Sequence, residues 1–290
     1  MPAQATFQFV EVATDVGIDG YTMQPGKGGS ILAVDFDNDD DIDLFAPTAD
    51  GIPNRLYRND GGTFVEMAAS VGLASLNAAR AALWFDYNSD HLLDLIVGGD
   101  CLTGHNPETG KELWRWGTWN PSRIGHWRLV PSPAAGGGVI LACAPKGSPV
   151  FAVKAGAHGE GELAWKSAGR TDAVTSDVCT PLFYGGNFYV VYGEARDKMI
   201  SCIAPDTVKV HWSTHLEGRA KFRASPTAAD GKIYLQNHAG EVFVVDAKKG
   251  TVLHRTVLGE QGDDLTRASV AIAGGQLFIR TNGTLFCVGR

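Results

Sequence analysis

Six aspartates within nine residues, between positions 35 and 43, constrain this chain more than any other feature. Carboxylates this close repel one another, so the run is either a solvated loop or the wall of a cation site. Apolar residues flank it on both sides, which predicts a short loop between two strands. Loop positions 1, 3, 5 and 9, together with the backbone carbonyl at position 7, form an all-oxygen set suited to Ca²⁺. These positions are Asp35, Asp37, Asp39, Asp43 and, for the carbonyl, Asp41.

A weaker copy of this loop begins 51 residues later. It places Asp86, Asn88, Asp90 and Asp94 at the same four positions, and the carbonyl of Leu92 at position 7. Two such loops indicate an internal repeat and a chain that binds calcium. Neither loop indicates a substrate or a reaction.

A second repeat, which begins Phe-Val-Glu, occupies residues 9–18 and again residues 64–73. The later copy ends a unit for which alternating apolar and polar residues predict four short strands. These strands are expected at residues 31–36, 42–46 and 55–58, with the fourth beginning at Phe64. Four strands in about 45 residues are typical of one β-propeller blade or one solenoid coil.

Different markers recur after residue 100. The ends of outer strands are expected at Trp114, Trp165, Trp212 and His254, and Ser-Pro or Thr-Pro pairs at 132, 180 and 225 run in phase with them. Because the tryptophans recur with the repeat, we expect them to pack blades together rather than to bind a ligand. The chain then divides into six units at residues 30–73, 79–117, 127–169, 174–218, 221–261 and 266–290.

The last unit contains only three expected strands, and an orphan strand is expected at Phe7–Val12. Pairing the two would close the ring and remove the open sheet edges, whereas a solenoid would need caps at both ends. We therefore predict an all-β fold: one closed β-propeller domain spanning residues 1–290, monomeric, with six four-stranded blades. Seven blades stay open as an alternative, because the long connection at residues 117–126 has room for further strands.

Residues 1–100 resemble the FG-GAP or VCBS repeats of integrin-alpha-like propellers. The resemblance rests on the two aspartate loops, on Asn-Arg-Leu-Tyr-Arg-Asn at 54–59 and on the Phe-Val-Glu segments. It implies that the loop residues named above bind Ca²⁺. The family usually has Gly at loop position 6, where this chain has Asp40 and His91. A positive φ there would cost about 1 kcal/mol and weaken metal binding, more in the second loop.

Residues 101–290 resemble the PQQ-like repeat family. The resemblance rests on Glu-Thr-Gly-Lys-Glu-Leu-Trp at 108–114 and Ala-Asp-Gly-Lys-Ile-Tyr at 229–234. Many quinone enzymes of that family carry two adjacent cysteines beside the cofactor, and this chain has no adjacent pair. We therefore expect these repeats to form a scaffold without PQQ.

The two resemblances meet near Asp100 and Cys101, inside one expected blade. Such a seam indicates recombination of two propeller fragments, either natural or engineered. We favour an engineered chimera, because the join completes a blade and the chain shows no secretory signal. Localisation stays open, since relatives of both families are mostly exported.

Composition argues against several functions. The net charge of −7 argues against a nucleic-acid partner, and no apolar run is long enough to span a membrane. The five cysteines are scattered and odd in number, so we expect free, buried thiols. The eight histidines show no metal-binding or catalytic spacing, and no Ser-His-Asp order is apparent.

We therefore expect a scaffold without enzymatic activity that holds calcium in its aspartate loops. An alternative is a lectin-like or protein-binding module, whose protein or small-molecule ligand sits at the mouth of the central channel. Four arginines are expected to open inner strands there: Arg80, Arg128, Arg223 and Arg267. We favour the interpretation that they pair with acidic neighbours such as Asp177. A remnant of a hydrolase, lyase or dehydrogenase would need a cluster of titratable groups in one pocket.

Overall fold

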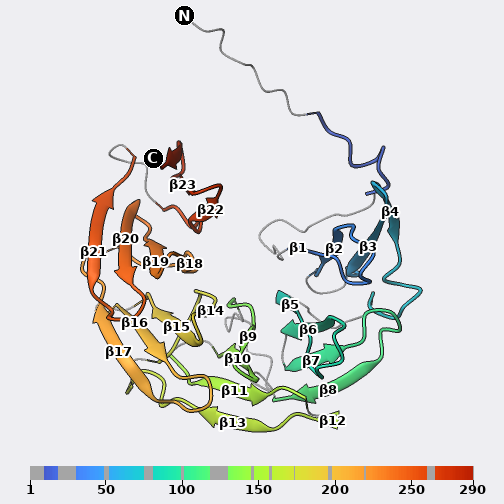
Figure 1. The fold of residues 1–290 in the computed structure, drawn as a ribbon, viewed down its shortest axis with the longest axis horizontal. Helices are drawn as coiled ribbons and strands as arrows, with labels where there is room; N and C mark the ends of the chain where they lie inside the picture. Colours follow the sequence, from blue (N-terminus) through green and yellow to red (C-terminus); the bar gives the residue numbers. More distant parts are fainter. Residues whose placement is uncertain are drawn as a thin grey trace, which may run out of the picture.

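The computed structural model describes residues 10–18, 31–48, 52–74, 81–98, 101–117, 130–144, 147–156, 159–172, 174–194, 198–218, 220–259 and 265–289. Within these ranges every regular element is a β-strand. Six sheets follow one another around a curve, with the sheet of β1–β4 at one end and the sheet of β22–β24 at the other (Figure 1). The chain is a six-bladed β-propeller, as its sequence predicts.

The first three blades match the first three predicted units. The first sheet contains β1 (Leu32–Val34), β2 (Asp43–Ala46), β3 (Arg55–Asp60) and β4 (Thr63–Glu66). The second contains β5 (Ala81–Phe85), β6 (Asp94–Gly98), β7 (Leu102–His105), β8 (Glu112–Trp116) and a fifth strand, β12 (Gly159–Glu160), which pairs in parallel with β8. The third contains β9 (Ala134–Gly136), β10 (Val139–Cys143), β11 (Val150–Lys154) and β13 (Leu163–Lys166). The sequence did not predict β12, which joins the outer edge of the second blade from a loop of the third.

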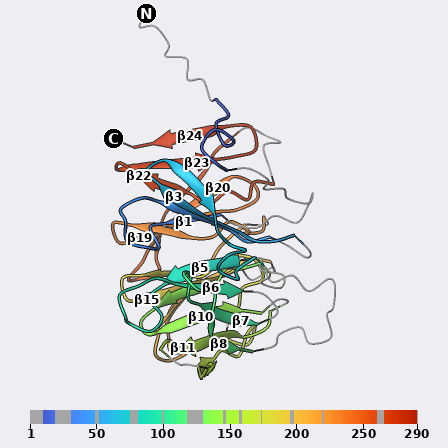
Figure 2. The same ribbon diagram turned by 90° about the vertical axis from the view of Figure 1, so that its right-hand side faces the viewer.

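The last three blades match the last three units. The fourth sheet contains β14 (Leu182–Tyr184), β15 (Asn187–Tyr192), β16 (Met199–Ile203) and β17 (Val210–His215). The fifth contains β18 (Thr227–Ala229), β19 (Lys232–Gln236), β20 (Glu241–Asp246) and β21 (Val252–Val257). The sixth contains β22 (Ala271–Ala273), β23 (Gln276–Arg280) and β24 (Leu285–Val288). In the turned view, strands such as β5, β10 and β24 run along the viewing direction of Figure 1 (Figure 2).

Two-residue turns connect the inner two strands of the later blades. Gly-Gly pairs at 137–138, 185–186 and 274–275 form three of these turns, and Asp230-Gly231 forms a fourth. Both residues of each pair have a positive φ, the conformation of the type I′ hairpin turn. The Gly-Gly and Asp-Gly pairs therefore specify the turn between the inner two strands of each of these blades.

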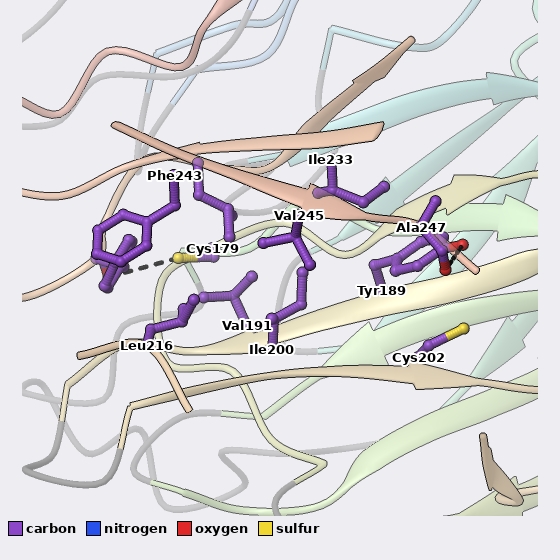
Figure 3. Close-up of a cluster of buried hydrophobic side chains, with 12 residues drawn as sticks. Cys179, Tyr189, Val191, Ile200, Cys202, Leu216, Ile233, Phe243, Val245 and Ala247 are labelled. Atoms are coloured by element: carbon purple, nitrogen blue, oxygen red, sulfur yellow. Dashed lines mark hydrogen bonds between the residues drawn. The ribbon is translucent and has the colours of Figure 1, made fainter. Parts of the chain in front are cut away.

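Apolar side chains fill the space between neighbouring sheets. One cluster includes Tyr189 and Ile200 of the fourth sheet with Ile233 and Phe243 of the fifth, all buried (Figure 3). The Tyr189 hydroxyl donates a hydrogen bond to the carbonyl oxygen of Ala247, 3.0 Å away, and so ties the two sheets together. Sheets that are apolar on both faces are what the stacked blades of a propeller require.

The tryptophans pack between blades, as predicted. The indole nitrogen of Trp165 donates to the carbonyl of Pro205, and that of Trp212 to the carbonyl of Ala247, each in the next blade. Trp114 is buried, stacks on Tyr87 of its own blade with a centroid distance of 4.5 Å, and belongs to a cluster that includes Ile140 and Val153 of the third blade. These contacts anchor one blade on the next.

Two sequence predictions about the ends of the ring have different outcomes. The sixth sheet has three strands in the described ranges, as expected. Of the predicted Phe7–Val12 strand, residues 7–9 lie outside the described residues, and residues 10–12 form no strand. Ring closure by this strand therefore stays a prediction.

The cysteines are all free, as expected, but their burial differs from the prediction. Cys143, Cys179 and Cys202 are buried, Cys101 is partly buried, and Cys287 is exposed on β24. The prediction of burial is wrong for Cys287, because β24 is the last strand of the sixth sheet in the described part of the chain.

No helix in the described ranges has the length and hydrophobicity needed to cross a membrane.

Candidate metal site

The first aspartate loop connects β1 to β2 in the first blade. The Asp35 carboxylate closes the loop, because its two oxygens accept hydrogen bonds from the backbone nitrogens of Asp39 and Asp40 at 3.1 and 3.0 Å. Asp39 in turn accepts a bond from the backbone nitrogen of Asp41 at 2.9 Å. The side chains at positions 1 and 5 are thereby held in fixed orientations.

Three of the predicted ligands converge. One carboxylate oxygen from each of Asp35, Asp37 and Asp39 lies within 4.8 Å of the other two. Oxygens bound to one Ca²⁺ at 2.3–2.6 Å are at most about 5 Å apart, so this spacing fits a shared calcium ion. One oxygen of Asp37 is buried and has no hydrogen-bond partner in the described structure. A buried acceptor without a donor is costly, and a cation would satisfy it.

Both burial and repulsion between carboxylates change the pKa of Asp37. Burial raises the pKa of this carboxyl, and the neighbouring loop carboxylates raise it further, led by Asp43. Arg58 acts in the opposite direction, but its guanidinium pairs with Asp60 at 2.7 Å. The donor set is therefore rich in negative charge and suited to a hard divalent cation.

Asp43, at loop position 9, joins the loop to the sheet. It is 1% exposed, and its two oxygens accept bonds from the backbone nitrogens of Phe36 at 3.0 Å and Asn59 at 2.8 Å. Asn59 belongs to β3 and also donates from its side chain to the carbonyl of Ile42. Asp43 thus links β1, the loop and β3 before any metal binds. Burial raises the pKa of Asp43, although the two backbone donors oppose this increase.

The backbone at loop position 6 has a positive φ in both loops, which is the costly conformation expected from the sequence. Asp40 and His91 both have φ of 71°, and position 4 of each loop is also left-handed, at Asn38 and Ser89. Such conformations favour Gly, and they cost less for Asn and Asp than for other residues. The strain is therefore larger at His91 than at Asp40.

The second loop, between β5 and β6, repeats part of this arrangement. Asp86 accepts bonds from the backbone nitrogens of Asp90 and His91, both at 3.1 Å, as Asp35 does in the first loop. Asn88 at position 3 is neutral, and its amide donates to Asp90 at 2.9 Å. The second loop therefore carries fewer charges to bind a cation and uses part of its donor set internally.

At loop position 9, the surroundings of Asp94 differ clearly from those of its counterpart Asp43 in the first loop. It is 3% exposed and accepts a bond from the backbone nitrogen of Tyr87 at 3.1 Å. Burial raises its pKa from 3.8 to about 6. In the described part of the second blade, no bond like that from Asn59 to Asp43 reaches Asp94 from the third strand, and the backbone donors Tyr87 and Asn88 only partly offset the effect of burial.

The side chain of Asp41 has a role different from that predicted for its backbone carbonyl. Its carboxylate accepts a bond from the backbone nitrogen of Gly61 at 2.7 Å, in the turn between β3 and β4. Ligation by the carbonyls of Asp41 and Leu92 stays a prediction.

The four arginines expected at the channel mouth do not form one described cluster. Arg80 and Arg128 lie outside the described residues. Arg223 forms an ion pair with Glu194, with Nε 2.6 Å from Oε1, and Arg267 is exposed. Asp177, the acid suggested by the sequence, instead accepts a bond from the backbone nitrogen of Gly147. Arg223 therefore has an acidic partner as expected, but a different one.

A group of charged side chains around Glu194 was not predicted from the sequence. Lys221 also binds this carboxylate, at 2.9 Å, and the backbone nitrogen of His238 donates to the Lys221 carbonyl. Burial raises the pKa of Glu194, but the hydrogen bonds from Arg223 and Lys221 outweigh this effect and lower it. Burial, together with Arg223 and Arg267, lowers the pKa of His238, whose Nε2 is buried without a partner in the described structure. No sequence motif marks this group, since 29 residues separate Glu194 from Arg223.

Comparison with known protein families shows two matches in this chain. The profile described as outer membrane protein assembly factor BamB matches residues 98–288, well over half of the chain. The chain belongs to this family. The FG-GAP-like repeat profile matches residues 35–97, so the BamB-type and FG-GAP-type repeats meet at the end of β6 in the second blade. Both resemblances inferred from the sequence are confirmed.

Solved structures support the fold. The crystal structure of BamB from Moraxella catarrhalis is similar with a TM-score of 0.56 and 12% identity, over 87% of this chain and 71% of that chain. The computationally designed Ika8 protein gives a TM-score of 0.64 and 15% identity, over 89% and 70%. Quinohemoprotein alcohol dehydrogenase from Comamonas testosteroni gives 0.53 and 13%, over 68% and 40%. A comparison with curated protein sequences gives no significant match.

Proposed function

We propose that this protein is a non-catalytic propeller scaffold, recombined from two repeat families, in which Ca²⁺ stabilises the first blade. The observation that carries the proposal is the convergence of Asp35, Asp37 and Asp39, with the buried and unpartnered oxygen of Asp37 among them. These carboxylates would hold the ion, with Asp43 orienting the loop from behind. Calcium would neutralise the repulsion among them and fix the β1–β2 connection.

The expected effect is a gain in stability by linkage. A ligand that binds only the folded state at 100 times its dissociation constant stabilises it by about 2.7 kcal/mol. No reaction is assigned to the ion, because its ligands serve a loop between two strands. The second loop is a weaker candidate, since Asn88 is neutral and His91 is strained.

Asp37→Asn is the decisive variant, and Asp41→Asn is its matched control. Both remove one negative charge from the same loop, but only Asp37 contributes an oxygen to the convergent set. We expect Ca²⁺ to raise the melting temperature of the unaltered protein and of Asp41→Asn, and calorimetry to detect binding in both. We expect Asp37→Asn to lose most of this response. An equal response of all three proteins, or none, would show that the loop is a solvated turn.

A ligand-binding role at the channel mouth is a second candidate. It is favoured by buried polar atoms without described partners in the Gln236 amide and at Nε2 of His238, whose ring feels the charges of Arg223 and Glu194. Such groups can be satisfied by a polar ligand such as a glycan or an acidic peptide. A glycan array and a peptide library, each repeated with Arg223→Ala, would test it. Binding that Arg223→Ala leaves unchanged would place the ligand elsewhere.

A further inference from the structure

Two polar side chains lie on the face of the fifth blade that meets the sixth. Tyr234 of β19 belongs to the apolar cluster that these two blades share, and Gln236, two positions further along the strand, lies on the same face. Thr227 of β18 is the cross-strand partner of Tyr234, so it lies on this face as well. The inner strand of the sixth blade, β22, lies against β18 (Figure 1). Gln236 and Thr227 are therefore placed at the boundary between the two blades.

The polar atoms of these two side chains have no hydrogen-bond partner in the described structure. Gln236 is 1% exposed, and both its amide nitrogen and its amide oxygen are buried and unpaired. The hydroxyl oxygen of Thr227 is also buried and unpaired. A buried polar group without a partner is costly, and most such groups in folded proteins are paired. A ligand that both donates and accepts hydrogen bonds would satisfy this face.

The bonds that join the inner strands of neighbouring blades end at the same boundary. The backbone nitrogen of Ser132 donates to the Thr180 hydroxyl, and that of Thr180 donates to the Ser225 hydroxyl, each at 3.0 Å. Ser269 is the counterpart of Ser225, because Arg-Ala-Ser precedes the inner strand in both blades. Among the described residues no such bond runs from Ser225 to Ser269, which is exposed. The inner edge of this boundary is therefore available to a ligand.

Positive charge surrounds the next polar group along the chain. His238 lies two positions beyond Gln236, and its Nε2 is buried without a partner in the described structure. Burial lowers the pKa of this imidazole, and three cations lower it further: Arg223, Arg267 and Lys221. Because Arg267 precedes the inner strand of the sixth blade, His238 lies near both blades. A neutral imidazole can donate a hydrogen bond to an anion.

The charges of this group are not balanced. Lys221 and Arg223 share one carboxylate, that of Glu194, at 2.9 and 2.6 Å. Arg267 is exposed and has no acidic partner among the residues that the structure describes. An excess of positive charge beside unpaired hydrogen-bonding groups favours an anionic ligand, since hydrogen bonds between charged groups are stronger than neutral ones.

We propose that the boundary between the fifth and sixth blades binds a small hydroxycarboxylate, such as a sugar acid. Its carboxylate pairs with Arg267 and accepts a bond from the His238 imidazole, and its hydroxyl groups bond to the Gln236 amide and the Thr227 hydroxyl. The Gln236 amide has no hydrogen bond to break in the described structure, so it can turn towards the ligand. This assignment rests on the second candidate function above, ligand binding at the channel mouth, and names the class of ligand.

Three probes separate the two parts of this recognition. Calorimetry of the full chain is done in EDTA with glucuronate, with glucose, which has hydroxyl groups but no charge, and with acetate, which has the charge but no hydroxyl group. We expect glucuronate to bind about tenfold more tightly than either of the others, because each of them lacks one set of hydrogen bonds. EDTA keeps calcium from the aspartate loops, so the result does not depend on the proposed metal site.

Two variants and one matched control locate the binding. Gln236→Leu removes the unpaired amide, and Arg267→Gln removes the exposed charge. Lys248→Gln removes the same charge from an exposed turn before β21. We expect the affinity for glucuronate to fall about tenfold in the first two variants and to stay unchanged in the third. Without any probe, Gln236→Leu should melt at a higher temperature, because an apolar side chain replaces unpaired polar atoms.

The pKa of His238, followed by nuclear magnetic resonance, reports on the site directly. A bound carboxylate should raise this pKa, whereas a purely structural role of these residues would leave it unchanged when glucuronate is added. Selective binding of glucuronate that Gln236→Leu or Arg267→Gln weakens supports the proposal. Equal affinities for the three probes, no binding of glucuronate, or an equal loss in Lys248→Gln would overturn it. If the glycan array gives a ligand but glucuronate does not bind, this assignment fails and the second candidate function stands.

Discussion

Replacing Asp94 by Asn tests the electrostatics of the second loop most sharply. Asp94 is 3% exposed, and its pKa is raised from 3.8 to about 6 because burial disfavours the carboxylate. A group whose pKa is raised on folding stabilises the protonated folded state, so stability falls as the pH rises from about 4 to about 6 and is constant above that. The difference corresponds to about 3 kcal/mol at pH 7.

Asn has nearly the same shape and no charge. Its side-chain oxygen can still accept the bond from the Tyr87 nitrogen, although a neutral acceptor weakens that bond by about 1 kcal/mol. In EDTA at pH 7 we therefore expect Asp94→Asn to be more stable than the unaltered protein by about 1–2 kcal/mol in urea unfolding. At pH 4 the advantage should disappear, because Asp94 is then protonated in the folded protein.

Asp90→Asn is the matched control in the same loop. The pKa of Asp90 is lowered, first by the hydrogen bond from the Leu92 nitrogen and then by the Asn88 amide, so its charge favours folding. In EDTA at pH 7 we expect Asp90→Asn to lose stability. In saturating Ca²⁺, the order of Asp94→Asn and the unaltered protein should reverse if the second loop binds the ion. A loss of stability in Asp94→Asn in EDTA, undiminished at pH 4, would refute the reasoning.

Three further variants test separate parts of the structure. His91→Gly should stabilise the protein by about 0.5–1 kcal/mol in urea unfolding, because φ at this position is 71° and Gly adopts it without strain. Gly104→Ala should cost about 1–3 kcal/mol and broaden the thermal transition, because the new Cβ would lie 2.0 Å from Nε1 of buried Trp114. Glu194→Gln should destabilise the protein at pH 7, and this loss should shrink as the pH falls below 4.5, because the lowered pKa of Glu194 adds its full stability above the ordinary value of 4.5 and loses it as the pH falls through the folded-state pKa. A pH-independent loss in chemical unfolding would assign the effect to packing alone.

The sequence predicts where each repeat begins, because the conformation of a short turn depends on the residue types within it. The Gly-Gly and Asp-Gly pairs that open the later blades each require a positive φ at two adjacent residues, and that requirement can be read directly from residue types. The aspartate loops could also be recognised from the sequence, since the predicted metal ligands of each loop lie within nine residues. Strand ends moved by one to three residues, as with β1 at Leu32–Val34 rather than 31–36.

Contacts across long sequence separations were not predictable in this way. Nothing near Arg223 indicates that its partner is Glu194 rather than Asp177, since only the packing of two blades decides which acid is closest. The exposure of Cys287 depends on which strand is last in its sheet, and not on its neighbours in sequence. The stabilisation of Asp43 by Asn59 is also invisible without the pairing of β2 with β3.

The boundary between the two repeat profiles shows how strands of two repeat families can form one blade. The profiles meet at the end of β6, and this strand pairs with β7 in an ordinary antiparallel ladder, with Leu95 opposite His105 and Gly98 opposite Leu102. Backbone hydrogen bonds in a ladder do not depend on side chains, so strands from two families can pair.

The second blade, in which the two profiles meet, also buries polar groups that have no partner in the described structure. His105 and Trp114 each bury a nitrogen without a partner in the described structure, whereas Trp165 and Trp212 of the later blades both donate to a carbonyl. In the residues that the structure describes, no third-strand donor reaches Asp94 as Asn59 reaches Asp43. Each unsatisfied buried group costs about 1–3 kcal/mol, so substitutions at these positions of the second blade are expected to raise the stability of the protein.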